Sequence, residues 1–290
     1  MLKKFQPVIA ILLLAIAGFL WFTRGAEILK STDSPDQKYV DATVGAAYQG
    51  VSETASLDQA KARAFLRTAE QAKPENAYTD YLRASVAAKE GDTAGATKAL
   101  LAGNAKKEVI HYILELPAHE NESSLSVLRA LSNHGEKLAS DKGEDAGAFF
   151  DALRVASYRI IGLEPITTLS VAAGVSLINQ VYSDGITHFT KSAPETAKAW
   201  EKDRAAFKAW SKIYREKQST QLGNVISEVG KEAGLSKAEI EDVALKKPLA
   251  DTAKQAKVDE LMAEVVVKEQ KLLRDIVSDL PKIESKQGNN

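Results

Sequence analysis

The chain has 290 residues, of which 44% are hydrophobic and 27% are charged, an ordinary globular composition that excludes a disordered, collagen-like or multi-span membrane protein. It carries 38 Lys and Arg against 39 Asp and Glu, a formal net charge of -1, so it lacks the basic footprint of a nucleic-acid-binding protein. It contains no cysteine, which excludes a disulfide, a thiol nucleophile, a cysteine zinc site and a lipid-modified N-terminal cysteine.

Residues 1–26 are predicted to form a membrane anchor. The segment 7–22 (PVIAILLLAIAGFLWF) carries no charge, and as a helix it spans about 24 Å. Flanking Phe5 and Thr23 lengthen this apolar segment toward the ~30 Å of a bilayer core. Because Lys3 and Lys4 precede it, the positive-inside rule places the N-terminus in the cytoplasm and the body outside, most simply in a bacterial periplasm.

The same segment permits a second interpretation. Ala15-Ile16-Ala17 has the small-x-small form of a signal-peptidase site, so cleavage near Ala17 would release a secreted protein. We favour the uncleaved anchor because the apolar residues 19–22 continue beyond that site. A buried globular helix is a third interpretation, disfavoured because the segment is apolar on all sides.

Beyond the anchor the sequence predicts helix after helix. Seven prolines fall at or near the edges of periodic segments, where helices tolerate proline. Capping boxes, in which Ser precedes Gln or Glu by three residues, begin at Ser34, Ser56, Ser192 and Ser236, and further N-cap candidates are Asn76 and Asp92. Apolar stripes at helical spacing comprise Val40, Val44, Ala47, Tyr48 and Val51, then Phe149, Leu153, Ala156 and Ile160, then Trp200, Phe207, Trp210 and Tyr214.

Three further segments complete the helical pattern. Residues 109–116 (VIHYILEL) are predicted to be a buried helix, because a lone strand would have no partner. Residues 166–178 are apolar but too short to cross a bilayer, so we expect a core helix there. The segment of about 249–280 predicts a long final helix with one apolar side, formed by Val258, Met262, Val265, Leu272 and Ile276.

A pattern recurs at an offset of 34 residues. Asp58-x-Ala60-x5-Leu66 is repeated as Asp92-x-Ala94-x5-Leu100, with a Pro-x-Asn turn at residues 74–76 and a Gly-Asp turn at residues 91–92 between them. Helix, turn, helix, turn, helix at this period resembles the tetratricopeptide repeat over about residues 35–106. The resemblance implies stacked helical hairpins that bind a protein or peptide on a concave surface, and it implies no catalysis.

The residue types that carry chemistry do not form a recognised catalytic motif. His119-Glu120 begins like a zinc-protease helix, but Ser123 stands where the second histidine is required. Glu115, Glu120 and Glu122 near His111 and His119 are the one place to look for a divalent ion, although a solvated loop around Pro117 is the preferred interpretation. Asn121-Glu122-Ser123 matches a glycosylation sequon that matters only in a eukaryotic secretory pathway.

The aromatic stripe of residues 200–214 supports two interpretations. Trp200, Phe207, Trp210 and Tyr214 could line a groove for a ligand or partner, but aromatic residues at helical spacing are more often core. The charged final helix could likewise pair with a partner helix, although a helix packed in a bundle is the simpler interpretation.

The sequence therefore predicts an all-α protein: an anchor at 1–26, tetratricopeptide-like hairpins at 27–106, a larger helical bundle or array at 107–286, and a disordered tail at 287–290. We expect a non-catalytic, membrane-tethered extracytoplasmic adaptor or scaffold that holds a protein partner, with no catalytic residue, no cofactor, no metal and no nucleic acid. A helical binding protein with a small or lipidic ligand between helices is the alternative, and an enzyme is a distant third.

Overall fold

The structure, a computed structural model, describes residues 35–52, 56–110, 122–140, 144–162, 166, 168–236, 238–240 and 251–283. Within these residues the protein is all-α, as predicted. The helices are α2 (Pro35–Gly50), α3 (Gln59–Ala72), α4 (Tyr78–Glu90), α5 (Thr93–Ala105), α6 (Glu122–Leu138), α7 (Glu144–Ile161), α8 (Thr168–Ser192), α9 (Pro194–Glu232) and α11 (Thr252–Ser278). The expected anchor at 1–26 and the expected tail at 287–290 lie outside the described residues. Across the described part of the chain, every helix is too short or too polar to cross a membrane.

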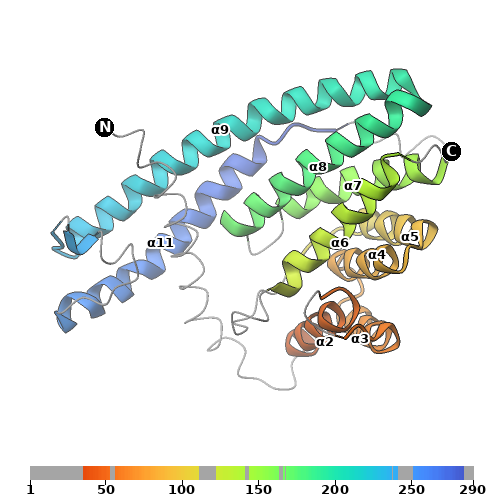
Figure 1. The fold of residues 1–290 in the computed structure, drawn as a ribbon. Helices are drawn as coiled ribbons and strands as arrows, with labels where there is room; N and C mark the ends of the chain where they lie inside the picture. The colour runs from red at the N-terminus through yellow and green to blue at the C-terminus, as the bar shows by residue number, and fades with distance from the viewer. Residues whose placement is uncertain are drawn as a thin grey trace.

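Two helical hairpins form one end of the molecule (Figure 1). Helix α2 pairs with α3, and α4 pairs with α5. The second hairpin turns at Gly91, whose left-handed φ of 77° closes α4, and Asp92 then caps α5 by accepting a hydrogen bond from the Gly95 amide at 2.8 Å. The Gly-Asp turn is therefore confirmed as a connection between two antiparallel helices.

The second helices of the two hairpins, α3 and α5, have similar residues at positions that are 34 residues apart in the sequence. Asp58 caps α3 by accepting from the Lys61 amide, as Asp92 caps α5. The pairs Ala62 and Ala96, and Leu66 and Leu100, are all buried. Where the first hairpin has buried Ala69, the second has Gly103, because a Cβ there would lie 2.7 Å from the Tyr81 ring. Residues separated by 34 positions therefore have the same capping or buried place in α3 and α5.

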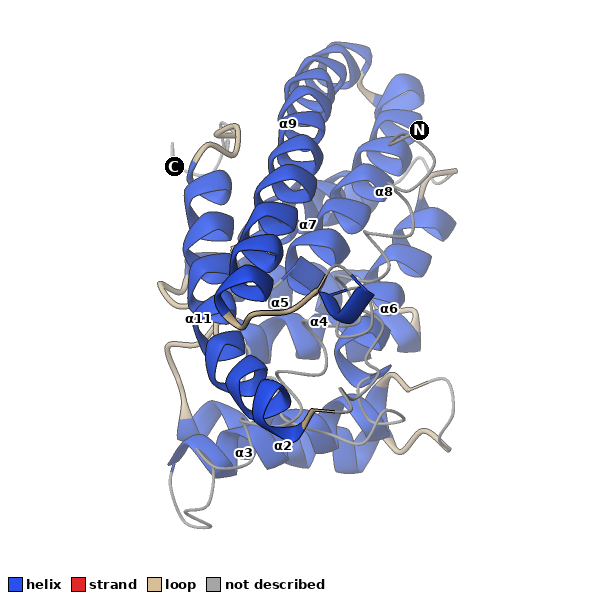
Figure 2. Cartoon of the chain, turned by 90° about the vertical axis from the view of Figure 1, so that its left-hand side faces the viewer, coloured by secondary structure: helices blue, strands red, loops and turns tan. Residues whose placement is uncertain are grey.

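The other end is built on α9, the longest helix (Figures 1 and 2). Helices α8 and α9 are antiparallel, so that Thr168 at the start of α8 meets Gln218 of α9. The remaining part of α9, residues 219–232, extends past the start of α8 by about 21 Å at the helical rise of 1.5 Å per residue. Helix α11 also packs against α9.

One large core links these parts. It draws residues from α4 through α9 and from α11, on both sides of residue 106, and its largest fully buried side chains include Trp200, Tyr182, Phe149, Phe150 and Phe207. A smaller core lies between α2, α3, α4 and α6. The expectation of a core helix within 166–178 is confirmed, because α8 begins at Thr168 and Val171, Val175 and Ile178 are buried.

The prediction of a helix over residues 109–116 was wrong for its first two residues. Glu108 pairs with Asn76 in an isolated bridge, and Val109 and Ile110 are not helical. The cause is tertiary: buried Asn76 donates to the Ile110 carbonyl at 2.8 Å and accepts from the Ile110 amide at 3.0 Å. Residues 111–116 lie outside the described residues.

Three predicted N-caps were also wrong. Helix α4 has Ala77 rather than Asn76 at its N-cap position, without a side-chain capping hydrogen bond. Helix α3 is capped by Asp58 rather than Ser56, because the helix starts at Gln59. Ser192 ends α8 and donates to the His188 carbonyl instead of capping α9. The capping box at Ser236 is confirmed: its amide donates to Glu239 at 2.7 Å, and the Glu239 amide donates to the Ser236 hydroxyl at 3.3 Å.

Candidate functional site

The four aromatic side chains of α9 proposed to line a groove lie inside the protein. Trp200, Phe207, Trp210 and Tyr214 are each no more than 5% exposed. Their spacing places them on one face of α9, where side chains of α7 and α8 contact the first two and α11 contacts Trp210. A ligand or partner that contacts them must therefore lie between helices or displace one of them.

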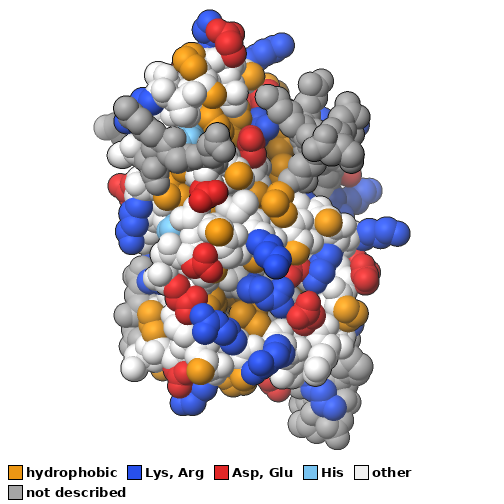
Figure 3. Space-filling model, turned by 90° about the vertical axis from the view of Figure 1, so that its right-hand side faces the viewer, with side chains coloured by type: hydrophobic (Ala, Val, Ile, Leu, Met, Phe, Trp, Pro, Cys, Tyr) orange, Lys and Arg blue, Asp and Glu red, His pale blue; other side chains and the backbone are white. Residues whose placement is uncertain are grey.

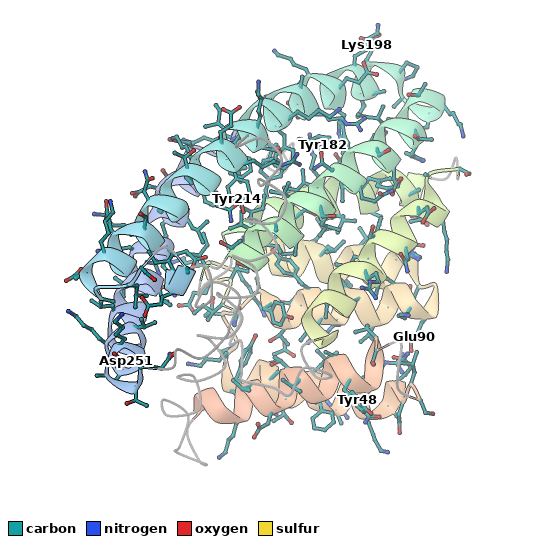
Figure 4. All side chains as sticks on the ribbon, turned by 60° about the vertical axis from the view of Figure 1, so that its left-hand side comes forward. Tyr48, Glu90, Tyr182, Lys198, Tyr214 and Asp251 are labelled. Atoms are coloured by element: carbon teal, nitrogen blue, oxygen red, sulfur yellow. The ribbon has the colours of Figure 1, made fainter. Side chains whose placement is uncertain are left out.

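The stripe belongs to a continuous set of ring contacts. Trp200 packs against Tyr182 and Phe189 of α8, with ring centroids 5.7 and 5.1 Å apart. Further along α9, the rings of Trp210 and Tyr214 are stacked, 5.7 Å apart and 9° from parallel. Figure 4 shows Tyr182 and Tyr214 between the ribbons of α8 and α9, whereas Lys198 points away from the body. The face is thus packed as core along its length.

A buried arginine joins the first part of this face to its surroundings. The Arg154 guanidinium of α7 lies 4.5 Å from the centre of the Trp200 ring and forms an ion pair with Asp203 at 2.7 Å. Beside it, the hydroxyls of Tyr158 and Tyr182 are 3.0 Å apart. Burial raises the pKa of both tyrosines above the ordinary value, so both rings remain neutral hydrogen-bonding groups. These partners all belong to the protein itself, although the Arg154 Nε is buried without a hydrogen-bond partner among the described residues.

Polar side chains gather where α8, α9 and α11 meet, at the far end of the stripe. The Thr168 hydroxyl donates to Glu269 at 2.6 Å and accepts from the Gln218 amide at 3.1 Å. Glu269 is 8% exposed, and the Tyr214 hydroxyl is buried without a hydrogen-bond partner among the described residues. We call Thr168, Tyr214, Gln218 and Glu269 the α8–α9–α11 junction.

Electrostatics at the junction favour neutral groups. Burial raises the pKa of the Glu269 carboxyl, although hydrogen bonds from the hydroxyl and amide of Thr168 act in the opposite direction. Burial also raises the pKa of Tyr214, and the nearby Glu269 carboxyl adds to that increase. The buried Glu269 carboxyl and the unpaired Tyr214 hydroxyl, beside the Trp210 ring stacked on Tyr214, are polar groups that could together hold a small polar ligand.

The junction is closed by α11. The Trp210 indole donates from Nε1 to the Ile276 carbonyl at 3.0 Å, and Lys217 forms an ion pair with Asp279 at 3.6 Å. Since Glu269 and Ile276 both belong to α11, this helix supplies one wall of the junction and covers the aromatic face. The sequence marked the aromatic stripe but not Glu269 or Thr168, which no spacing rule singles out.

The candidate metal residues are not brought together by what the structure describes. His111, Glu115, His119, Glu120 and the sequon residue Asn121 lie outside the described residues, as does the Glu122 side chain. The two histidines that are described are buried. Among the described residues, no group of three His, Asp or Glu side chains is placed to hold a metal ion.

One of these two histidines packs against α5 and α7. His134 makes a hydrogen bond to the Thr93 hydroxyl at 3.1 Å and contacts the Phe149 ring edge-on. Burial lowers its pKa, so the neutral imidazole is favoured in the folded protein. Its surroundings are those of a core side chain.

The sequence did not anticipate which large hydrophobic side chains are exposed. Tyr48 was placed in a core stripe, but it is 46% exposed on the outer face of α2. Leu101 is exposed on α5, and on the face drawn in Figure 3 charged side chains of both signs are interspersed with hydrophobic ones. Leu101 lies seven residues, or two turns, after Ala94, so the two share one face of the helix. This spacing was the sequence signal for an apolar face on α5.

Comparison with known protein families, curated proteins and solved structures finds no match to this chain.

Proposed function

We propose that the protein is a membrane-tethered, extracytoplasmic adaptor or scaffold that binds a protein partner and has no catalytic role. Residues 5–23 provide the tether, and Lys3 and Lys4 set its orientation. Because the positively charged end remains in the cytoplasm, the helical body lies outside it, in a periplasm if the source is bacterial. The partner binds to the second helical hairpin.

The observation that carries this proposal is an apolar face on α5. Leu101 is 39% exposed, and on the same side of the helix Ala94, Ala102 and Ala105 are exposed as well. Lys98 is the one charged side chain among them. A monomeric surface helix usually presents a polar outer face, so an alanine and leucine face on α5 favours a docking surface for another polypeptide.

The equivalent roles of the two hairpins support the same function. Asp58 and Asp92 cap α3 and α5, and Leu66 and Leu100 are buried at matching places. A tetratricopeptide-like stack built in this way presents helical surfaces to protein or peptide ligands. The proposal extends that family's mode of binding to residues 35–105 of this chain.

Site-specific photo-crosslinking tests the docking surface. A photoreactive amino acid replaces Leu101 in the full chain, which is irradiated in its native membrane. We expect one discrete crosslinked product that is absent when Ala105 is changed to Asp in the same protein. Ile213 of α9, 49% exposed, is the matched control position and should give no discrete product. Crosslinking from Ile213 alone, or from neither position, would overturn the proposed surface.

A reporter fused after residue 290 tests the location. An enzyme that is active only outside the cytoplasm should be active in this fusion, because positive-inside orientation exports the body. Activity of a cytoplasmic reporter at the same place would contradict the topology. If the mature protein begins at Gly18 in N-terminal sequencing, export stands but the anchor is replaced by a cleaved signal peptide.

A second function, binding of a small or lipidic ligand between helices, is favoured by the α8–α9–α11 junction. The unpaired Tyr214 hydroxyl and the Glu269 carboxyl offer a buried polar end to an otherwise aromatic face. Native mass spectrometry of the purified chain should then show a bound small molecule that Tyr214→Phe releases. The matched change Tyr158→Phe, at a hydroxyl already bonded to Tyr182, should retain it.

A further inference from the structure

Three large hydrophobic side chains are exposed together on the α2–α3 hairpin. Tyr48 is 46% exposed, Leu57 41% and Phe65 37%. Six large hydrophobic side chains are exposed in the described part of the chain, so half of them lie within residues 48–65. We call Tyr48, Leu57 and Phe65 the hairpin patch. Single exposed hydrophobic residues are ordinary, but a group of three that includes two aromatic rings indicates a contact surface.

The patch is one surface because the two helices hold its members together. The Phe65 ring lies over Gly45 of α2, where an added Cβ would be only 2.8 Å from the ring. Tyr48 is three residues after Gly45, on the same side of α2. The Asp58 amide donates to the Gln49 carbonyl at 2.8 Å, which holds the backbone at Leu57 beside the last turn of α2.

The edge of the patch provides little net charge. Lys61 and Asp58 form an ion pair at 3.2 Å, so one positive group is balanced by one negative group. Arg63 is paired with Glu90 of α4. Attraction to a highly charged partner is therefore weak here, and the apolar side chains dominate what the surface can bind. Tyrosine suits the interface of a membrane with water, and phenylalanine and leucine are apolar residues that helices lying in this interface insert into the lipid.

The position of the patch in the chain favours a bilayer as its occupant. Residues 23–34, twelve residues, connect the apolar segment 7–22 to the start of α2 at Pro35. Twelve extended residues reach at most about 40 Å. If residues 7–22 lie in a bilayer, α2 is the first described helix after the tether, and its start lies within this reach of the lipid surface.

We infer that the hairpin patch rests on the interface of the bilayer in which the chain is anchored. The inference depends on the membrane tether of the proposed function. Three partly exposed side chains are too small a surface to hold a soluble protein on a membrane, but a tether raises their local concentration at the lipid and so makes weak contacts effective. With α2 and α3 on the membrane, α9 lies at the end of the body away from it (Figure 1).

Fluorescence quenching tests this inference in the full chain. Because the chain has no cysteine, Leu57→Cys creates a single site for an environment-sensitive fluorophore. The labelled protein is placed in phosphatidylcholine nanodiscs, one copy in each, with and without lipids that carry a nitroxide quencher. We expect blue-shifted emission and a several-fold loss of intensity with the quencher, unchanged by added salt. Ile213→Cys on α9, labelled in the same way, is the control and should not be quenched.

Each other result has a definite meaning. If the chain does not incorporate into nanodiscs, residues 5–23 are not a membrane tether, and the proposed function is contradicted as well. A chain that incorporates but whose label at 57 is not quenched overturns the inference alone, as does equal quenching at 57 and 213. Blue-shifted emission that requires two copies in each nanodisc shows that a second chain covers the patch. Tyr48→Asp, a change at an exposed side chain, should abolish quenching at 57 without preventing incorporation.

Discussion

The Thr168 hydroxyl donates a 2.6 Å hydrogen bond to the Glu269 carboxyl, joining the first residue of α8 to α11 across 101 residues of sequence. The amide of Thr168 also donates to this carboxyl. Glu269 therefore satisfies the start of α8 as an N-cap side chain would, although it comes from another helix. This relationship explains how an acidic residue that is 8% exposed is accommodated in the core.

Glu269 should make the stability of the protein depend on pH. Burial raises the pKa of its carboxyl in the folded state above the ordinary value of 4.5. At a pH between the pKa of Glu269 in the unfolded chain and its higher pKa in the folded protein, the folded protein binds more protons than the unfolded chain. The contribution of Glu269 to the free energy of unfolding therefore falls as the pH rises through this interval. We expect Glu269→Gln to raise the unfolding midpoint at neutral pH relative to wild type and to flatten this part of the pH profile.

The control for this measurement is Glu228→Gln, a change at an exposed carboxyl of α9. It should leave the pH profile of thermal unfolding unaltered. A wild-type profile that rises steadily from pH 4.5 to neutrality, and that Glu269→Gln does not change, would show that the Thr168 hydrogen bonds outweigh burial at this carboxyl.

Trp210 should secure α11 on α9. Trp210→Phe removes the indole donor to the Ile276 carbonyl, a loss of about 0.5–1.5 kcal/mol for an ordinary hydrogen bond. The Ile276 carbonyl still accepts from the Asp279 amide at 3.2 Å, so it is not left without a partner. Trp210→Ala also leaves a cavity beside Tyr214 and should cost about 3–5 kcal/mol. Denaturant unfolding measures both values.

Hydrogen exchange of the same variants locates the effect. The amides of α11 should exchange faster in Trp210→Phe, while those of α4 should be unchanged because α4 makes no contact that depends on Trp210. Equal acceleration in both helices would mean that α11 opens only when the whole protein unfolds.

The helical class and many helix edges could be predicted because they depend on local rules. Asp92 caps α5 as expected, and apolar spacing identified the buried face of α9. Periodicity defines a face but not what covers it, so the same stripe fitted a core and a groove. The choice between Ser56 and Asp58 as N-cap depends on the bond from the Asp58 amide to Gln49, which no local rule contains.

The residues that sequence analysis missed are those defined by distant partners. Glu269 resembles any other acidic residue of the final helix until Thr168 is placed beside it. Residues 109–110 have strong apolar character, yet Asn76 holds them in a non-helical conformation. Tyr48 has the correct spacing for a core stripe, but the described helices leave 46% of its side chain exposed. Such contacts require the tertiary structure.

Asn76 should be among the most sensitive polar residues of the hairpins. Its side chain donates to the Tyr39 hydroxyl at 2.9 Å and to the Ile110 carbonyl at 2.8 Å, and it accepts from the amides of Tyr78 and Ile110. Asn76→Ala leaves several buried groups unpaired, each costing about 1–3 kcal/mol. We expect a loss of stability above about 3 kcal/mol, against almost none for the exposed control Gln71→Ala. If the free energy of unfolding measured with denaturant falls by only a few tenths of a kcal/mol, water replaces the hydrogen bonds of this side chain.

The close approach of α4 and α5 should depend on two alanines on either side of the Gly91 turn. Ala84 and Ala96 are fully buried in the same core cluster. A leucine at either position would overpack the contact between the helices, so Ala84→Leu and Ala96→Leu should each destabilise the protein by about 1–3 kcal/mol. Asp92→Ala should cost about 0.5–2 kcal/mol, because it removes the hydrogen bond to the Gly95 amide.

Lys89→Ala is the control for this series, since Lys89 is exposed near the end of α4 and its replacement should change stability very little. Chemical denaturation of the four variants ranks them directly. The expected order places both leucine variants at or above Asp92→Ala in cost, and Lys89→Ala last. Neutral leucine variants together with a damaging Lys89→Ala would mean that small side chains do not set the spacing of α4 and α5. That result would contradict the tetratricopeptide-like interpretation of this hairpin. It would also contradict the proposed partner surface on α5, which depends on that interpretation.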